Sequence, residues 1–182
     1  MAKLVSKVYG DALFETAMEK ELVDTLYEET SALLPILQDN PELFSVLGNP
    51  QIVKEEKVTL LHQVFSGKIA EELMGFLSII VEKDRQNEMI SILEYFIQRV
   101  KEFKKIGAAY VTSAVELGAE QKAGLEKKLL ETTSYVAFEM HYSVDPALLG
   151  GMVIRIGDHV VDSSIKTRLY ELKKELSALQ LA

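Results

Sequence analysis

The side chains best suited to chemistry are a histidine and two acids in the segment 148–169. His159 directly follows Asp158 and precedes Asp162, so a His–Asp pair could transfer protons or contribute to a metal site. The other histidines, His62 and His141, lie at no helical spacing from His159 or from each other, and the chain has no cysteine to complete a zinc site. The G-x-S-x-G pattern of an activated serine is absent. We therefore expect no catalytic residue and no metal site; the alternative is a small enzyme that uses His159 and Asp162.

The glycines of the same segment raise the question of a phosphate-binding loop. Gly150, Gly151 and Gly157 do not form G-x-G-x-x-G, the spacing that lets a backbone cradle a dinucleotide. Gly67–Lys68 lacks both the earlier glycine and the following serine or threonine of a P-loop. The sequence therefore predicts that the chain binds no nucleotide and needs no other cofactor.

Composition indicates an ordinary globular chain with an acidic balance of charge. The 182 residues are 48% hydrophobic and carry a formal net charge of −8, so a nucleic-acid partner is not expected. No basic and then apolar leader begins the chain, which predicts that there is no signal peptide. The most apolar window, residues 73–81, is too short to span a bilayer. Any membrane association is therefore expected to come through another protein.

Apolar side chains recur with the period of an α-helix through residues 1–106. The segments 69–80 and 89–103 show the clearest spacing, with apolar positions three, four and seven residues apart. A further stripe in the opening segment includes Val8, and shorter helical stretches are expected at 22–37, at 39–50 and after Pro50. Helices of this kind with short connections are typical of an antiparallel bundle. The period therefore predicts a helical N-terminal domain over residues 1–106.

The pattern changes near Gly107 to one with a period of two. The segments 108–116 and 135–144 alternate and are rich in β-branched and aromatic residues, which predicts two strands. A helix is expected between them, and a stripe of leucines after Ile165 predicts a final helix. The fold class is therefore mainly α with a smaller α/β domain over residues 107–182.

The segment 148–169 is better explained by folding than by chemistry. Gly157–Asp158 suits the two central positions of a type II′ turn, which would pair Ile156 with His159 in a β-hairpin. One face of this hairpin would then carry Met152, Ile154, Ile156, His159 and Val161.

The flanks of the hairpin have structural roles as well. Gly150–Gly151 predicts a bend or a close approach of two backbones where the first strand begins. Arg155 and Asp162 would be diagonal neighbours able to form an ion pair. Asp162, Ser163 or Ser164 could cap the final helix by accepting a hydrogen bond from a free amide.

This segment also resembles the signature of the delta subunit of F-type ATP synthases, whose mitochondrial counterpart is the oligomycin-sensitivity-conferring protein. The matching residues are Gly150, Gly151, Arg155, Gly157, Asp158, Val161, Asp162, Ser164, Ile165, Arg168 and Leu169. The family often has glycine where Ser163 stands, which suggests that this position does not require a positive φ. Three helical segments, 9–17, 47–61 and 76–96, resemble further elements of the family in the family's order.

The resemblance implies a six-helix N-terminal bundle followed by a smaller α/β C-terminal domain with a β-hairpin. It also implies a structural subunit without an active site, a stator connector that holds the catalytic head still so that proton-driven rotation is coupled to ATP synthesis. The implied partners are the N-terminal helix of an alpha subunit for the bundle and the b subunits for the C-terminal domain. The implied location is peripheral, on the cytoplasmic side of the cell inner membrane, as part of the complex.

In the family, the bundle grips the alpha helix with its first and fifth helices. Apolar side chains in the segment 76–81 cover a wider arc than one core-facing stripe requires, and surplus apolar area on a bundle helix can form a groove for another helix. We expect the binding residues to be Tyr9, Ala12, Phe76, Ile79 and Ile80. An unrelated helical adaptor is the other hypothesis, and copurification with alpha and b subunits separates the two.

Overall fold

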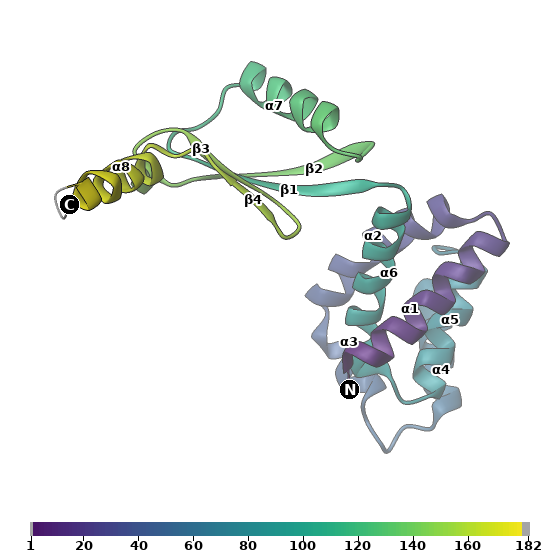
Figure 1. Cartoon of the computed structure of the whole chain (residues 1–182). Coiled ribbons are helices and arrows are strands. Elements are labelled where there is room, and N and C mark those ends of the chain that lie inside the picture. Colours follow the sequence, from purple (N-terminus) through teal and green to yellow (C-terminus); the bar gives the residue numbers. More distant parts are fainter. Residues whose placement is uncertain (1, 180–182) are drawn as a thin grey trace. The chain divides into compact units, whose positions relative to one another are not determined.

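Six α-helices form the N-terminal part of the computed structural model, which describes residues 2–179 (Figure 1). A single 3-10 turn, η1 (Gln86–Glu88), precedes the last of them. The six-helix bundle is therefore confirmed. Its helices are α1 (Ala2–Glu19), α2 (Val23–Asp39), α3 (Pro41–Leu47), α4 (Lys54–Phe65), α5 (Glu71–Glu82) and α6 (Met89–Phe103).

At the junction of α2 and α3, a side chain supplies a hydrogen bond to a carbonyl at the end of the first helix. α2 runs through Pro35 and ends at Asp39, because the Asn40 side chain donates a hydrogen bond to the Ile36 carbonyl (2.7 Å). Pro41 then begins α3, at a position where its missing amide costs nothing. A single residue, Asn40, thus separates α2 from α3.

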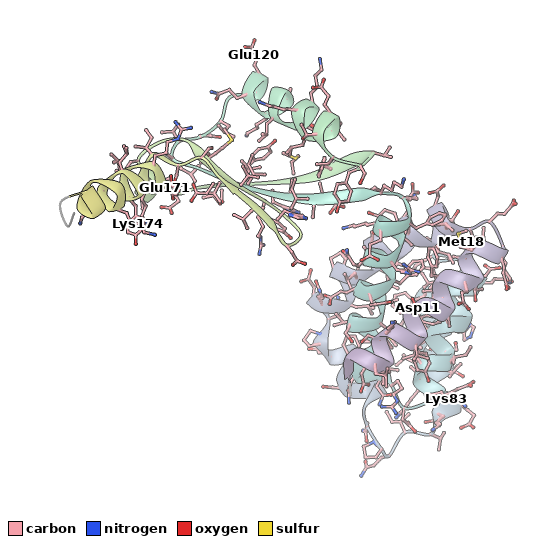
Figure 2. All side chains as sticks on the ribbon, in the orientation of Figure 1. Asp11, Met18, Lys83, Glu120, Glu171 and Lys174 are labelled. Carbon is pink, nitrogen blue, oxygen red and sulfur yellow. The ribbon has the colours of Figure 1, made fainter. Side chains whose placement is uncertain are left out.

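The apolar faces of these helices meet in one core. Its fully buried members include Leu77 and Ile80 on α5 and Phe96 on α6. α1 packs closely on α6 at Gly10. A side chain there would overlap the ring of Tyr95, so only glycine fits this contact. The Tyr95 hydroxyl donates a hydrogen bond to Asp11 (3.1 Å) at the rim of this contact. Charged side chains such as Lys83 in the bundle and Glu120 and Lys174 in the C-terminal part project from the surface (Figure 2).

The C-terminal part is built on a mixed four-stranded sheet in the order β2-β1-β3-β4. β1 and β2 are parallel, whereas β3 lies antiparallel to both β1 and β4. The helix α7 makes the crossover that a parallel pair requires. The elements are β1 (Ile106–Ser113), α7 (Ala119–Thr132), β2 (Ala137–Val144), the 3-10 turn η2 (Pro146–Leu148), β3 (Met152–Ile156), β4 (His159–Asp162) and α8 (Ile165–Leu179).

Among the described elements of the C-terminal unit, α7 covers one face of the sheet (Figure 1). Alternate residues of β1, from Gly107 to Ser113, are buried on that face, whereas Tyr110 on the other face is exposed. Gly107 has no room for a side chain, because a Cβ there would overlap the ring of Phe138. Phe138 and Leu129 complete a small core between sheet and helix.

Contacts divide the chain into two compact units, Met1–Lys101 and Glu102–Ala182. α6 ends at Phe103 and β1 begins at Ile106, so the change from helix to strand lies within a few residues of the division. Among the described residues, no helix combines the length and the hydropathy needed to cross a bilayer.

Candidate functional site

The turn between β3 and β4 has the geometry that its two central residues favour. Gly157 has a φ of +56°, whereas Asp158 does not have a positive φ, which is the pattern of a type II′ turn. Ile156 lies opposite His159, and the next pairs follow in the expected register. The predicted hairpin is therefore confirmed, and its glycine supplies a conformation that other residues adopt only with strain.

Gly150–Gly151 lies directly against the start of α8. The Ile165 amide donates a hydrogen bond to the Gly150 carbonyl (2.9 Å). Gly151 has a φ of +77°, and a side chain there would collide with the backbone of Ser163. The predicted close approach of two backbones is confirmed, and it fixes where α8 leaves the sheet.

Two side chains cap the first turn of α8. The Ser164 hydroxyl accepts a hydrogen bond from the Thr167 amide (3.2 Å), as an N-cap residue does. Asp162 accepts from the Thr167 hydroxyl (2.7 Å) and from the Ser164 amide (2.8 Å). These donors, the Thr167 hydroxyl above all, hold the pKa of the Asp162 carboxyl below its ordinary value. Asp162 is thus engaged in holding a helix end.

The prediction that Arg155 and Asp162 could form an ion pair is wrong. In the described part of the chain, the Arg155 guanidinium forms no ion pair and lies 4.7 Å from the centre of the Tyr110 ring. Tyr110 also stacks on His141, with 4.7 Å between ring centres. The carboxylate of Asp162 turns to the α8 cap instead, where it accepts two hydrogen bonds rather than forming one exposed charge pair.

The histidines lie on three separate elements and do not converge. His62 is on α4, His141 on β2 and His159 on β4. β2 and β4 are the opposite edges of the sheet, so about 14 Å of sheet separates the last two. Among residues 2–179, no group of three or more histidines and acids could hold a metal ion. His159 itself is an exposed residue of β4.

The five residues expected to bind a partner helix do not share one surface. Ile80 is fully buried and Phe76 nearly so, because both point into the bundle core. Their expected role as exposed binding residues is corrected accordingly. Ile79 is 48% exposed, Tyr9 is half-buried and Ala12 is exposed.

The outer face of α1 is apolar in its first half. Leu4 and Val8 are exposed one turn apart, and Ala12 follows one turn later. The helical period predicts that Val8 belongs to the apolar stripe of this helix, but the structure leaves it 58% exposed. The inward face consists instead of smaller or well-enclosed residues, among them Leu13 and Ala17.

α1 and α5 are joined at one end by an ion pair. The Lys20 ammonium, just after α1, lies 3.1 Å from Glu72 in the first turn of α5. The backbone amide of Glu72 and Lys20 both help to lower the pKa of that carboxyl. Tyr9 lies three turns before Lys20 and Ile79 two turns after Glu72, so each shares a helix face with the ion pair. Tyr9 and Ile79 therefore border the same seam between α1 and α5.

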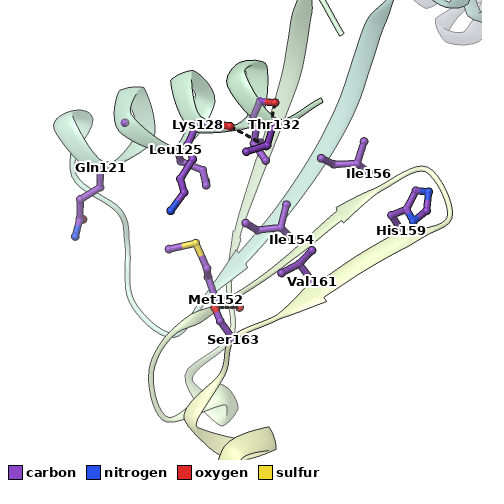
Figure 3. A pocket seen from close by; sticks show the side chains of 12 residues that line it. Gln121, Leu125, Lys128, Thr132, Met152, Ile154, Ile156, His159, Val161 and Ser163 are labelled. Atoms are coloured by element: carbon purple, nitrogen blue, oxygen red, sulfur yellow. Dashed lines mark hydrogen bonds between the residues drawn. The ribbon is translucent and has the colours of Figure 1, made fainter. Parts of the chain in front are cut away.

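A second apolar surface lies in the C-terminal unit, where α7 leaves half of the sheet uncovered. It is a groove of about 580 Å³ between α7 and the hairpin (Figure 3). The hairpin face that lines it is the one expected from the alternation of Met152, Ile154 and Val161. The opposite wall of the groove, on α7, was not predicted from the sequence, although the apolar residues Leu125 and Leu129 lie one helical turn apart there. The full lining is Gln121, Gly124, Leu125, Lys128, Leu129, Thr132, Met152, Ile154, Ile156, His159, Val161 and Ser163.

α8 carries a third apolar surface that is largely exposed. Ile165, Leu169 and Leu172 are exposed along one stripe of the helix. The side chains of Leu176 and Leu179, which continue the stripe in the sequence, lie outside the described residues. Because Ser163 lines the groove and Ile165 begins α8, the groove and the stripe follow one another closely along the chain.

Comparison with known proteins gives one consistent family. The model of the ATP synthase delta (OSCP) subunit family matches residues 5–176. An ATP synthase subunit delta of Lachnoclostridium phytofermentans is 49% identical over 181 residues, which cover 100% of both chains. Another, of Desulforamulus reducens, is 36% identical over 94% of each chain.

The fold is also found among solved structures. A chain in the cryo-EM structure of the Toxoplasma gondii mitochondrial ATP synthase hexamer superimposes with a TM-score of 0.68. The match covers 94% of this chain and 96% of the other at 18% identity, so it concerns the fold.

Proposed function

Because the chain belongs to the ATP synthase delta (OSCP) subunit family, a non-catalytic component of the peripheral stalk, we propose that it joins the catalytic head to that stalk by two separate sets of surfaces. Residues 1–106 would bind the N-terminal helix of an alpha subunit, and residues 107–182 would bind the b subunits. This division assigns the surface beside α1 and α5 to one partner, and the groove and the α8 stripe to the other. The stator role in proton-driven ATP synthesis then requires firm binding and slow release.

The seam between α1 and α5 supports the first assignment. Ile79 and Val8 expose large apolar side chains that the bundle itself does not use, and Tyr9 and Ala12 flank them. Such area suits the apolar face of an amphipathic helix. The exposed Ile79 beside this seam is the observation that carries the proposal, since its neighbours Phe76 and Ile80 are enclosed in the core.

Gly75 adds a residue to this surface. It lies in the middle of α5 and is exposed, and a side chain there would meet no atom of the chain within 4 Å. A glycine in a helix interior costs about 1 kcal/mol relative to alanine. The bundle therefore has no packing reason to keep a glycine here, whereas close approach by a partner helix would supply one.

The first assignment is tested with Ile79→Asp and a peptide that corresponds to the alpha N-terminal helix. The peptide affinity should fall roughly ten-fold or more, because a charge would be buried against an apolar face. Ile36→Asp on α2 is the matched control, since Ile36 is 53% exposed on another helix and should leave the affinity unchanged. An unchanged affinity in folded Ile79→Asp would remove this surface from the interface. Phe76→Asp is unsuitable, because it would place a charge in the core.

The groove and the α8 stripe support the second assignment. Both are apolar, and cations border them: Lys128 at the groove and Lys166 and Arg168 on α8. An amphipathic b-subunit helix with acidic flanks fits this combination of an apolar floor and basic edges.

Two adjacent valines of β4 test the second assignment. Val161 lines the groove and is 62% exposed, whereas Val160 is 59% exposed on the opposite face of the sheet. Val161→Asp should weaken binding to the C-terminal segment of a b subunit roughly ten-fold or more, and Val160→Asp should not. Equal losses from both variants would contradict a role for the groove.

The family assignment also answers the alternative functions. The chain is a structural subunit of the complex rather than a small enzyme, and Asp162, the acid of the supposed pair, is engaged in the α8 cap. We further propose that the chain lies on the cytoplasmic side of the inner membrane and associates with the membrane only through the complex. Fractionation of cells with and without the b subunits tests this, since the chain should leave the membrane fraction when they are absent.

A further inference from the structure

A hollow of about 560 Å³ lies between α4 and α5. The side chains that line it come from the end of α4, the loop that follows and the first half of α5. They include His62, Ser66, Ile69, Glu71, Met74 and Gly75. A side chain at Gly75 would project into open space, so the glycine enlarges the hollow. Gly75 therefore belongs both to this hollow and to the surface assigned to the alpha subunit.

The lining combines buried apolar side chains with exposed polar ones. Met74 is only 6% exposed and Ile69 is half-buried, so they form the floor of the hollow. Glu71, His62 and Ser66 are exposed and form its rim. A lysine or arginine side chain has the same division, because its stem is apolar and its head is charged. The hollow therefore suits a long basic side chain better than a purely apolar one.

The charges around the hollow also favour a cation. Among the described residues, Glu71 forms no ion pair, whereas its neighbour Glu72 is paired with Lys20. α4 ends at Phe65, so the negative end of its dipole borders the hollow. Lys68, which is close in the sequence, lines a different hollow between α2 and α4. The carboxylate of Glu71 is thus available to a basic group from outside the described chain.

We propose that a lysine or arginine of the alpha subunit's N-terminal helix enters this hollow and pairs with Glu71. The inference rests on the proposed binding of that helix beside α5 and adds a determinant of specificity to it. The stem of the basic side chain would lie on Met74 and Ile69. Its charged head would donate hydrogen bonds to the Glu71 carboxylate and to the Ser66 hydroxyl.

The position of Glu71 on α5 gives this contact a geometric consequence. Glu71, Gly75 and Ile79 follow one another at intervals of four residues on the exposed side of the helix. Glu71 and Ile79 are therefore about 12 Å apart along the helix axis. A partner helix that lies along α5 needs a basic residue about eight positions from the apolar residue that meets Ile79. Because one contact is ionic and the other apolar, the two together fix the direction and register of the partner helix.

Binding of a peptide that corresponds to the alpha N-terminal helix tests the proposal on the full chain. Glu71→Gln should weaken the affinity about five-fold, and Glu71→Lys roughly ten-fold or more, because the second change sets two cations against each other. Both losses should shrink at high ionic strength, since salt screens exposed charges. Glu28→Gln is the matched control, because Glu28 is an exposed acid on α2, and it should leave the affinity unchanged.

An exchange of charges identifies the partner residue. Each lysine and arginine of the peptide is replaced by glutamate in turn, and one of these peptides should bind the Glu71→Lys variant better than the wild-type chain. Normal affinity in both Glu71 variants, or no such recovery with any peptide, would overturn the proposal. Equal losses from Glu71→Gln and Glu28→Gln would overturn it as well, because the effect would then be one of net charge.

Ile79→Asp separates this inference from the proposed function. If Ile79→Asp weakens binding while both Glu71 variants bind normally, the basic contact is wrong and the surface beside α1 and α5 stands. If Ile79→Asp also binds normally, the proposed surface fails together with the inference. Thermal unfolding of each variant verifies that the bundle keeps its fold.

Discussion

The N-terminal bundle and the C-terminal unit bury their apolar side chains to different extents. In the bundle, large side chains such as Leu77, Ile80 and Phe96 are completely enclosed, and one core runs through the six helices. In the C-terminal unit, the core cluster consists of Ala109, Leu129 and Phe138, of which the last two retain some exposure. The second unit therefore gains less stability from its own interior.

The two units also differ in the apolar surface that they leave exposed. The bundle closes its core but exposes apolar side chains on several helices, among them Val8 on α1, Ile36 on α2 and Ile79 on α5. In the C-terminal unit, α7 covers part of one sheet face, and a groove, exposed residues on the other face and an exposed stripe on α8 remain. The bundle thus encloses its large apolar side chains more completely than the C-terminal unit does.

The largest effect should come from emptying the bundle core. Phe96→Ala should reduce the free energy of unfolding of the bundle by about 3–5 kcal/mol, since the ring is fully enclosed and its removal leaves a cavity. Leu129→Ala in the C-terminal unit should cost about 2 kcal/mol, at the lower end for leucine, because the site opens toward the groove. Hydrogen exchange measured by mass spectrometry reports each unit separately. Equal losses in the two units would break the comparison.

A smaller effect is expected at the glycines that shape the C-terminal unit. Gly151→Ala should destabilise that unit by about 2 kcal/mol or more, because a positive φ and a collision with the Ser163 backbone act together. Gly157→Asn is the matched control, since Gly157 has a positive φ but open space and asparagine tolerates that conformation. Amide exchange over residues 106–174 measures both. If neither change affects amide exchange in the bundle, the two glycines stabilise the C-terminal unit alone.

The α8 cap should show a dependence on pH that the bundle core lacks. The pKa of Asp162 is lowered in the folded chain, so its contribution is complete above the ordinary value of about 4 and is lost as pH falls through the lowered value. The protection factors of the amides in the first turn of α8, which are corrected for the intrinsic exchange rate at each pH, should therefore fall in acid, and Asp162→Asn should remove this dependence. Ser164→Ala should cost about 1 kcal/mol at any pH. A pH-independent cap would show that the Asp162 hydrogen bonds contribute nothing.

The smallest effects should come from two helix glycines, one in each unit. Gly75→Ala in α5 and Gly124→Ala in α7 should each stabilise their unit by about 0.5–1 kcal/mol, because both positions are open and helical. Each substitution should at the same time weaken binding of the partner assigned to that surface. Thermal unfolding and peptide binding of the same variants measure the two effects. A gain in stability with no loss of binding would separate that glycine from the interface.

Local interactions were predictable from the sequence. The type II′ turn at Gly157 and the cap before α8 involve residues only a few positions apart, so residue type and spacing determine them. The alternation in β3 likewise predicted which hairpin face is apolar, and the groove lining confirms it.

The binding surfaces were less predictable. Apolar residues cover most of the circumference of α5 between Phe76 and Val81, so periodicity could not tell which of them faces the core. The structure turns Ile79 outward and Phe76 and Ile80 inward, and it exposes Val8 on α1. The rotation of a helix about its axis depends on its neighbours, which lie far away in the sequence.

The sequence by itself therefore determined the period of each element, the turns and caps, and the family to which the chain belongs, because these depend on residues near one another in the chain. Only the tertiary structure decided the strand order β2-β1-β3-β4, the half-covered sheet and the outward direction of Ile79. These features arise from packing between segments that are distant in the sequence. Such packing buries one face of a helix or sheet and leaves another face exposed. The surfaces that remain exposed are the ones through which we propose that this subunit binds its partners.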